Sequence, residues 1–280
     1  FTPAGAVDIA SRAIALELSK SLGVTVTVDN KPGAGGNIGG AEVARAAPDG
    51  YTILMTTSGI QAINPGLYAK MPFDTVKDLA PIAALVSLNN VLVVHPSVKA
   101  NSVSEFIALG KNNPVTVASS GNGTSIHMSG AMFTHLTGTE LIHVPYKGSG
   151  PAITDLMGSQ VEAMVDQLSA SIGHLRENKF RALAVTSKMR SSQLPNVPTL
   201  QELGVAGFEV GTFTGIFGRE AYYYFPTDGR YTSHYLIGIS VGGTQVIDPT
   251  GFASGDWSTQ YNALRNIYNF KKTVTSNTTL

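Results

Sequence analysis

Four short polar segments follow apolar runs and open helical patterns, and these are the places where the chain could do chemistry. The first amides of a helix have no intrahelical partner and lie at the positive end of the helix dipole, so such a turn can hold an anion. Glycine lets the backbone approach the anion closely, and serine and threonine hydroxyls add donors. The four turns are residues 3–8, 56–60, 119–125 and 146–150.

A simpler explanation exists for each turn, because serine, threonine and glycine also cap helices. For any one turn taken alone, capping is the better explanation. Lys147 is the only cation in the four turns; it could neutralise a second carboxylate or be solvated. Asp166 ends an apolar run and could accept from a ligand hydroxyl or amine, or cap the next helix with Ser169. His127 could reach a ligand or lie on a helix face.

Composition and motifs exclude several other functions. Lys plus Arg equals Asp plus Glu at 19 each, which disfavours binding to nucleic acid or to an anionic membrane. The chain has no cysteine and six histidines without the helical spacing of a zinc site, so we expect no metal. The dinucleotide pattern starting at Gly33 fails at Ile38, and no Walker loop or nucleophile elbow occurs. We therefore expect no cofactor and no catalytic residues.

The hydrophobic pattern alternates between helical and strand periods. Residues 8–22 predict a helix, residues 24–28 a strand and residues 38–46 a second helix. The alternation predicts an α/β fold with mostly parallel sheets. Further strands are expected at 51–56, 91–95, 115–118, 141–144, 163–165, 182–186 and 208–217, and further helices at 102–111, 124–136 and 151–157.

Several sequence blocks occur together in a characteristic order. They include residues 3–8, 29–40, 47–54, 74–81, 119–127, 143–149, 190–199 and 215–218. In this order and at these separations they resemble the Bug/TctC family of periplasmic solute-binding proteins of tripartite tricarboxylate transporters. The resemblance covers the chain from Phe1 to about Gly218. The family usually has two glycines where this chain has Ala4 and Gly5, and it carries a short apolar strand and a cleaved leader before this point.

The resemblance implies a two-lobed periplasmic-binding-protein-like fold (type II) with a ligand cleft between the lobes. Residues 1–95 and 212–280 would form lobe 1, and residues 96–211 lobe 2. The ligand would be a small organic acid (a di- or tricarboxylate, an aromatic acid or an acidic amino acid) captured in the periplasm and delivered to membrane transporter subunits. The residues expected to bind it are Thr2, Ala4, Gly5, Ala6, Asp8, Ser58, Gly59, Ser119, Ser120, Gly121, Asn122, Gly123, Thr124, Ser125, Lys147 and Asp166.

The last part of the chain departs from the family. Seven of the ten tyrosines and the single tryptophan lie in residues 219–280, where strands are expected around a turn at 222–241 and a helix at 257–272. This atypical tail leaves open an interaction or assembly role. A second alternative is an α/β enzyme acting on a small acid, with Asp166 or His127 as general base and the turn amides as an oxyanion site.

Overall fold

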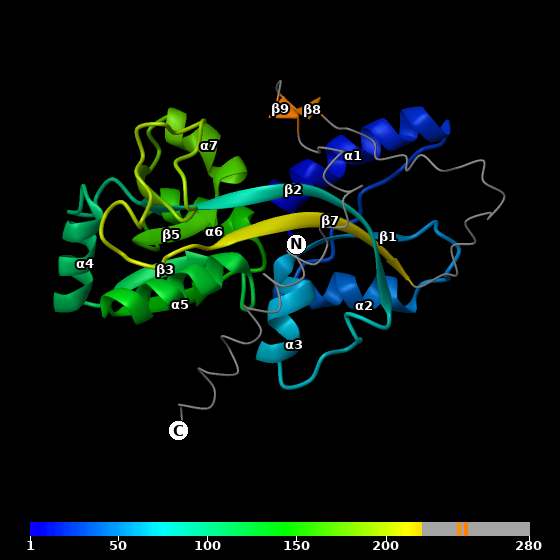
Figure 1. The fold of residues 1–280 in the computed structure, drawn as a ribbon, viewed down its shortest axis with the longest axis horizontal. Coiled ribbons are helices and arrows are strands. Elements are labelled where there is room, and N and C mark those ends of the chain that lie inside the picture. Colours follow the sequence, from blue (N-terminus) through cyan, green and yellow to red (C-terminus); the bar gives the residue numbers. More distant parts are fainter. Residues whose placement is uncertain (220–239, 242–243, 246–280) are drawn as a thin grey trace. The chain divides into compact units, whose positions relative to one another are not determined.

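A computed structural model describes residues 1–219, 240–241 and 244–245 of the 280-residue chain. Most of the predicted tail elements therefore lie outside the described residues. The elements are α1 (Ala6–Leu22), η1 (Ala34–Gly36), α2 (Asn37–Arg45), β1 (Ile53–Thr57), η2 (Gly59–Ile63), α3 (Asn64–Leu67), β2 (Leu79–Val94), α4 (Val103–Asn112), β3 (Val115–Ser119), α5 (Ser125–Thr137), β4 (Leu141–Pro145), α6 (Ser149–Met157), β5 (Ala163–Gln167), α7 (Leu168–Arg176), β6 (Arg181–Val185), β7 (Gly211–Arg219), β8 (Ser240–Val241) and β9 (Thr244–Gln245) (Figure 1).

The chain divides into two compact units. Unit 1 consists of Phe1–Gly39 and Ser87–Thr212, and unit 2 of Gly40–Val86 and the chain from Phe213 onward. Strands β2 and β7 each contribute residues to both units. Residues 1–39 thus group with the later part of the chain, whereas the predicted lobes placed them with residues 40–95; those lobe bounds stay a prediction.

Unit 1 is a mixed sheet with helices on both faces. Strand β3 runs parallel to β4 and to β5, whereas β2 runs antiparallel to β5 and to β6. In unit 2, β1 pairs antiparallel with β7. The α/β class is as predicted, but parallel pairs do not predominate among the described strands, because both neighbours of β2 in unit 1 run against it.

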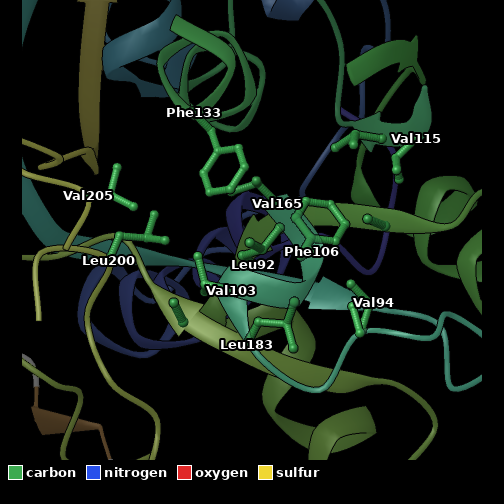
Figure 2. Packing of buried hydrophobic residues seen from close by; sticks show 14 of the residues in the cluster. Leu92, Val94, Val103, Phe106, Val115, Phe133, Val165, Leu183, Leu200 and Val205 are labelled. Atoms are coloured by element: carbon green, nitrogen blue, oxygen red, sulfur yellow. The ribbon is translucent and has the colours of Figure 1, made fainter. Parts of the chain in front are cut away.

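Alternate residues of β2 supply the two sides of the unit 1 core. Leu92 and Val94 join the cluster formed with α4 and α5, while Val91 and Val93 join the cluster formed with α6 and α7. This is the period-2 alternation of a strand covered on both faces. Figure 2 shows the first cluster, in which Phe106 of α4 and Phe133 of α5 meet with their ring centroids 5.8 Å apart.

One sequence prediction about local structure is wrong, and a helix was missed. Residues 24–28 form no strand, because no described segment pairs with them, and the N–H of Val26 donates instead to Ser19 Oγ at 2.8 Å. Helix α7 was not predicted at all, although Leu168 of this helix is buried in the core. The segment between the expected strand and α2 contains the short helix η1. Among the described residues, no helix is both long and apolar enough to cross a membrane.

The buried aromatic of α4 gives a test of this core. Phe106 is fully buried, so Phe106→Ala should lower the free energy of unfolding by about 3–5 kcal/mol through lost burial and a residual cavity. Met189→Ala, at a side chain that is 77% exposed, should change it by less than about 0.5 kcal/mol. Urea unfolding monitored by circular dichroism measures both, and equal effects would contradict the packing described here.

Candidate functional site

The turn before α1 is built around a residue in the left-handed region. Ala4 has φ 64°, its N–H donates to Asp8 Oδ2 at 3.0 Å, and Gly5 follows as the N-cap of the helix. A left-handed conformation costs alanine free energy that glycine does not pay. The turn nevertheless keeps this left-handed conformation with alanine at position 4.

Asp8 holds this turn from inside the protein. Its carboxylate accepts hydrogen bonds from Ala4 N, from Arg12 Nε at 3.1 Å and from Asn30 Nδ2 at 3.0 Å, and it pairs with the Arg12 guanidinium. Burial by itself would raise the pKa of Asp8, but the hydrogen bonds and the charge of Arg12 outweigh it and lower the pKa. Both carboxylate oxygens are thus engaged by the protein itself, so the structure gives Asp8 a role in positioning the turn.

The turn before α6 lies directly against the turn before α1, within unit 1. A Cβ added to Gly148, the N-cap of α6, would lie 2.9 Å from Thr2 N and would also meet Thr2 Oγ1. A Cβ added to Gly150 would lie 3.0 Å from Pro3 O, and one added to Gly5 would lie 3.9 Å from Ser149 Cβ. The absence of side chains at these glycines allows the two turns to meet, so the N-termini of α1 and α6 adjoin.

Two adjoining helix N-termini make a region rich in hydrogen-bond donors. Helices α1 and α6 have 17 and 9 residues, and their N-caps, Gly5 and Gly148, are glycines, which have no side chain to cap the first amides. Thr2 Oγ1 is buried beside them without a hydrogen-bond partner among the described residues. Since the amides and the positive ends of both dipoles lie together, this region suits an anion.

The turn before α5 is closed by its own side chains. Ser119 Oγ accepts from the N–H of Gly121 at 3.1 Å, while Thr124 Oγ1 donates to Gly121 O at 2.8 Å and accepts from the N–H of His127 at 3.2 Å. Gly121 has φ 126°, and a Cβ there would lie 2.9 Å from Tyr146 O. This turn therefore contacts the segment that leads into the turn before α6.

The other residues predicted in the α5 turn differ in their exposure and backbone conformation. Ser120 and Ser125 are buried, Gly123 has positive φ, and Asn122 is exposed.

Two stacked histidines lie beside the α5 turn. The rings of His127 and His143 are 4.2 Å apart at 22°, and His143 Nε2 is 2.6 Å from Ser119 Oγ. Burial, and secondarily the charge of His127, lower the pKa of His143 to about 4, and burial lowers the pKa of His127. An imidazole with so low a pKa is a weak general base near neutral pH. Ser119 is moreover buried, so the Ser119–His143 pair gives no support to a nucleophile.

Asp166 lies wholly inside the protein behind the α6 turn. Ser149 Oγ donates to its Oδ1 at 2.7 Å and Ser171 Oγ to its Oδ2 at 2.6 Å. Burial raises the pKa of Asp166, and the hydrogen bonds from Ser171 and Ser149 act against that shift. The alternative in which Asp166 and Ser169 together cap the next helix finds no support in Ser169, whose Oγ has no hydrogen-bond partner in the described part of the chain. The carboxylate instead orients Ser149, the first residue of α6.

The structure thus brings three of the four predicted turns together in unit 1. The exposed Lys147 precedes Gly148 in the α6 turn. Ser58 and Gly59 belong to unit 2, where they follow β1 and open η2. Sequence reasoning missed His143 and Ser149 as members of the site. Ser149 carried a usable signal, since a serine directly after Gly148 stands at a helix start.

The site has no metal or cofactor signature of its own. Within the described residues, no three His, Cys, Asp or Glu side chains lie where they could hold a metal ion. Its donors are backbone amides and hydroxyl groups, with the exposed Lys147 beside them. Donors of this kind can bind and orient an acid.

Comparison with known proteins identifies the family to which the chain belongs. The family model for the tripartite tricarboxylate transporter family receptor matches residues 10–221. Protein BugT of Bordetella pertussis is 39% identical over 211 residues, which are 74% of this chain and 65% of BugT. The chain spans 65% of the length of the first curated relatives that it matches.

Two similar solved structures contain small acids. Rpa4515 of R. palustris with adipate has a TM-score of 0.77 at 34% identity, over 79% of this chain and 75% of that one. MatC of Rhodopseudomonas palustris with bound malate has a TM-score of 0.74 at 32% identity, over 78% and 75%.

The fold is that of the periplasmic binding proteins. The chain belongs to the tripartite tricarboxylate transporter receptor family. The family resemblance and the α/β fold of the periplasmic-binding-protein type, both predicted from the sequence, are confirmed. Members of the family and the structural neighbours are solute-binding receptors rather than enzymes.

The left-handed residue at position 4 gives a prediction about stability. Ala4→Gly should raise the free energy of unfolding by about 0.5–1 kcal/mol, because relief of the left-handed cost exceeds the added freedom of the unfolded chain. Ala13→Gly, at an exposed position inside α1, should lower it by about 1 kcal/mol. Urea denaturation compares the two variants, and a loss of stability in Ala4→Gly would refute the strained turn.

The neutral histidine gives a prediction about pH. The pKa of His143 is about 4 in the folded protein, whereas the ordinary pKa of histidine, 6.5, applies in the unfolded chain. Between pH 4 and pH 6.5 the unfolded state therefore binds more protons than the folded state. The free energy of unfolding should therefore fall as the pH is lowered from about 6.5 to 4. Histidine ring resonances followed by NMR should show one ring still neutral near pH 5, which His143→Gln removes. Titration of that ring near pH 6.5 would contradict its burial.

Proposed function

We propose that this protein is an extracytoplasmic solute-binding protein that captures a small carboxylate ligand and delivers it to a tripartite tricarboxylate-type membrane transporter. Family membership supports the transport role, and the adipate and malate found with two relatives support a dicarboxylate ligand. The family also supports a periplasmic location. Of the acid classes considered, dicarboxylates are therefore favoured over tricarboxylates, aromatic acids and acidic amino acids.

The observation that carries this proposal is the meeting of the α1 and α6 N-termini at Thr2 and Gly148. A hydrogen bond to a charged group contributes about 1.5–3 kcal/mol, and a helix N-terminus adds about 0.3–1 kcal/mol. A few such contacts reach the roughly 8 kcal/mol of a micromolar complex. Neutral donors are therefore enough, and the proposal needs no buried cation.

Capture would proceed by closure of two lobes over the acid. The α1, α5 and α6 turns would hold one carboxylate, with Ser58 and Gly59 contributing from the other lobe and Lys147 near a second carboxylate. A ligand that contacts both lobes stabilises the closed form by its difference in affinity for the two forms. The acid is bound and released without a change in its covalent bonds.

The test combines a ligand screen with a matched pair of glycine variants. The wild-type protein should be stabilised by dicarboxylates such as adipate or malate, by about 2.7 kcal/mol at 100 times the dissociation constant. Gly148→Ala should weaken that affinity at least about tenfold, because the added methyl group displaces Thr2. Gly173→Ala, whose Cβ would meet no atom within 4 Å in α7, should leave it unchanged. Isothermal titration calorimetry measures each affinity.

Mass spectrometry of the recovered acid separates binding from catalysis. An acid returned unchanged supports a binding protein, and an altered acid would favour the enzyme alternative. If no acid binds to the wild type, or if both glycine variants retain full affinity, the proposed site is refuted.

A further inference from the structure

Asn90 is a buried polar residue that the site described above does not use. It lies in β2 directly before the apolar residues 91–94, with no exposed surface. Its backbone is satisfied, since Asn90 O accepts from Thr186 N at 3.0 Å and from Thr186 Oγ1 at 3.2 Å. Its side-chain amide faces α5, with Nδ2 3.4 Å from Ser125 Oγ and 3.2 Å from Ser129 Oγ.

The hydrogen bonds of Ser129 determine which way this amide faces. Ser129 Oγ donates its one proton to Ser125 O at 2.9 Å, so the group that faces Ser129 Oγ must be a donor. Asn90 Nδ2 therefore points to the serines and Oδ1 points away from them. Asn90 Oδ1 is buried and has no hydrogen-bond partner among the residues that the structure describes. A buried acceptor without a donor is costly, and a ligand that supplies the donor recovers that cost.

The position of this oxygen connects it with the candidate site. Ser125 is the first residue of α5, and the residues before it form the α5 turn. The start of α5 offers mainly donors to a ligand, so an acceptor on the side chain that lies beside Ser125 selects a different part of the ligand. A carboxylate has no proton to give to Asn90 Oδ1. A hydroxyl group has one, and unlike an ammonium group it enters a buried place without the cost of desolvating a charge.

We propose that Asn90 Oδ1 is an acceptor subsite that takes an O–H donor, either a hydroxyl group of the bound acid or a water molecule bound with it. This inference rests on the proposed function and adds a specificity element to it. Because the oxygen is shielded from bulk solvent, the hydrogen bond forms in surroundings of low dielectric, where it is stronger than in water. The subsite would distinguish hydroxylated diacids from the corresponding acids without the hydroxyl.

Pairs of acids that differ by one hydroxyl group test the subsite. Malate against succinate, and 2-hydroxyadipate against adipate, are titrated calorimetrically into the wild type, Asn90→Leu and Ser129→Ala. Leucine removes the acceptor at similar volume. Ser129→Ala is the matched control, because it removes one of the two hydroxyl groups that face Nδ2, while Ser125 Oγ, 3.4 Å from Nδ2, remains to hold the amide with Oδ1 in its present orientation. Asn90→Ser is a second variant without Oδ1, and thermal melts show which variants are folded.

If the ligand supplies the hydroxyl group, the wild type should bind the hydroxylated acid about tenfold more tightly than its partner acid. Asn90→Leu should lose that preference, and Ser129→Ala should keep it.

If a bound water molecule supplies the hydroxyl group, the wild type should bind the two acids of a pair with equal affinity. Asn90→Leu should then weaken the binding of both acids about tenfold, and Ser129→Ala should not. Unchanged affinities in folded Asn90→Leu and Asn90→Ser, or equal losses in Asn90→Leu and Ser129→Ala, would overturn the inference while leaving the proposed function standing. Failure of the wild type to bind any of the four diacids would contradict both.

Discussion

The close packing of Thr2 on Gly148 is the contact on which the rest of the site depends. No side chain fits at position 148 beside the Thr2 backbone, and this allows the starts of α1 and α6 to meet. Each turn is then held by a carboxylate behind it: Asp8 binds the Ala4 amide, and Asp166 binds the Ser149 hydroxyl. Both acidic groups face inward, so the donors beside them stay available to an incoming anion.

The hydrophobic core of unit 1 fixes the positions of these turns relative to one another. Strand β2 supplies alternate residues to two hydrophobic clusters, one packed with α4 and α5 and the other with α6 and α7. Strands β3 and β5 are fixed between these layers, and their carboxyl ends carry Ser119 and Asp166. Rigid strands covered on both faces position their terminal residues more accurately than a free loop does. The recognition groups therefore owe their positions to apolar side chains that never contact a ligand.

Much of this was predictable from the sequence, and the failures have physical causes. The helical period found α1, α4 and α5, and the order of sequence blocks indicated the family and the polar turns. The β-branched residues 24–28 suggested a strand, but a strand requires a partner, and no described segment pairs with them. The antiparallel pairing of β2 and the contact of Ser171 with Asp166 depend on tertiary packing, which local periodicity does not report. Asn90 was visible as a polar residue beside an apolar run, yet only the hydrogen bonds of Ser129 show which atom is unsatisfied.

The stacked histidines bear on how the site responds to its surroundings. Burial lowers the pKa of both His127 and His143, to about 4 for His143, and the amides and hydroxyl groups of the three turns do not titrate in mild acid. The amide and hydroxyl donors of the three turns thus keep their charge state while the medium acidifies mildly. Any acid sensitivity of capture would then originate in the protonation of the solute itself, so that the ionised fraction of the acid, and not a change in the protein, would set how much is taken up.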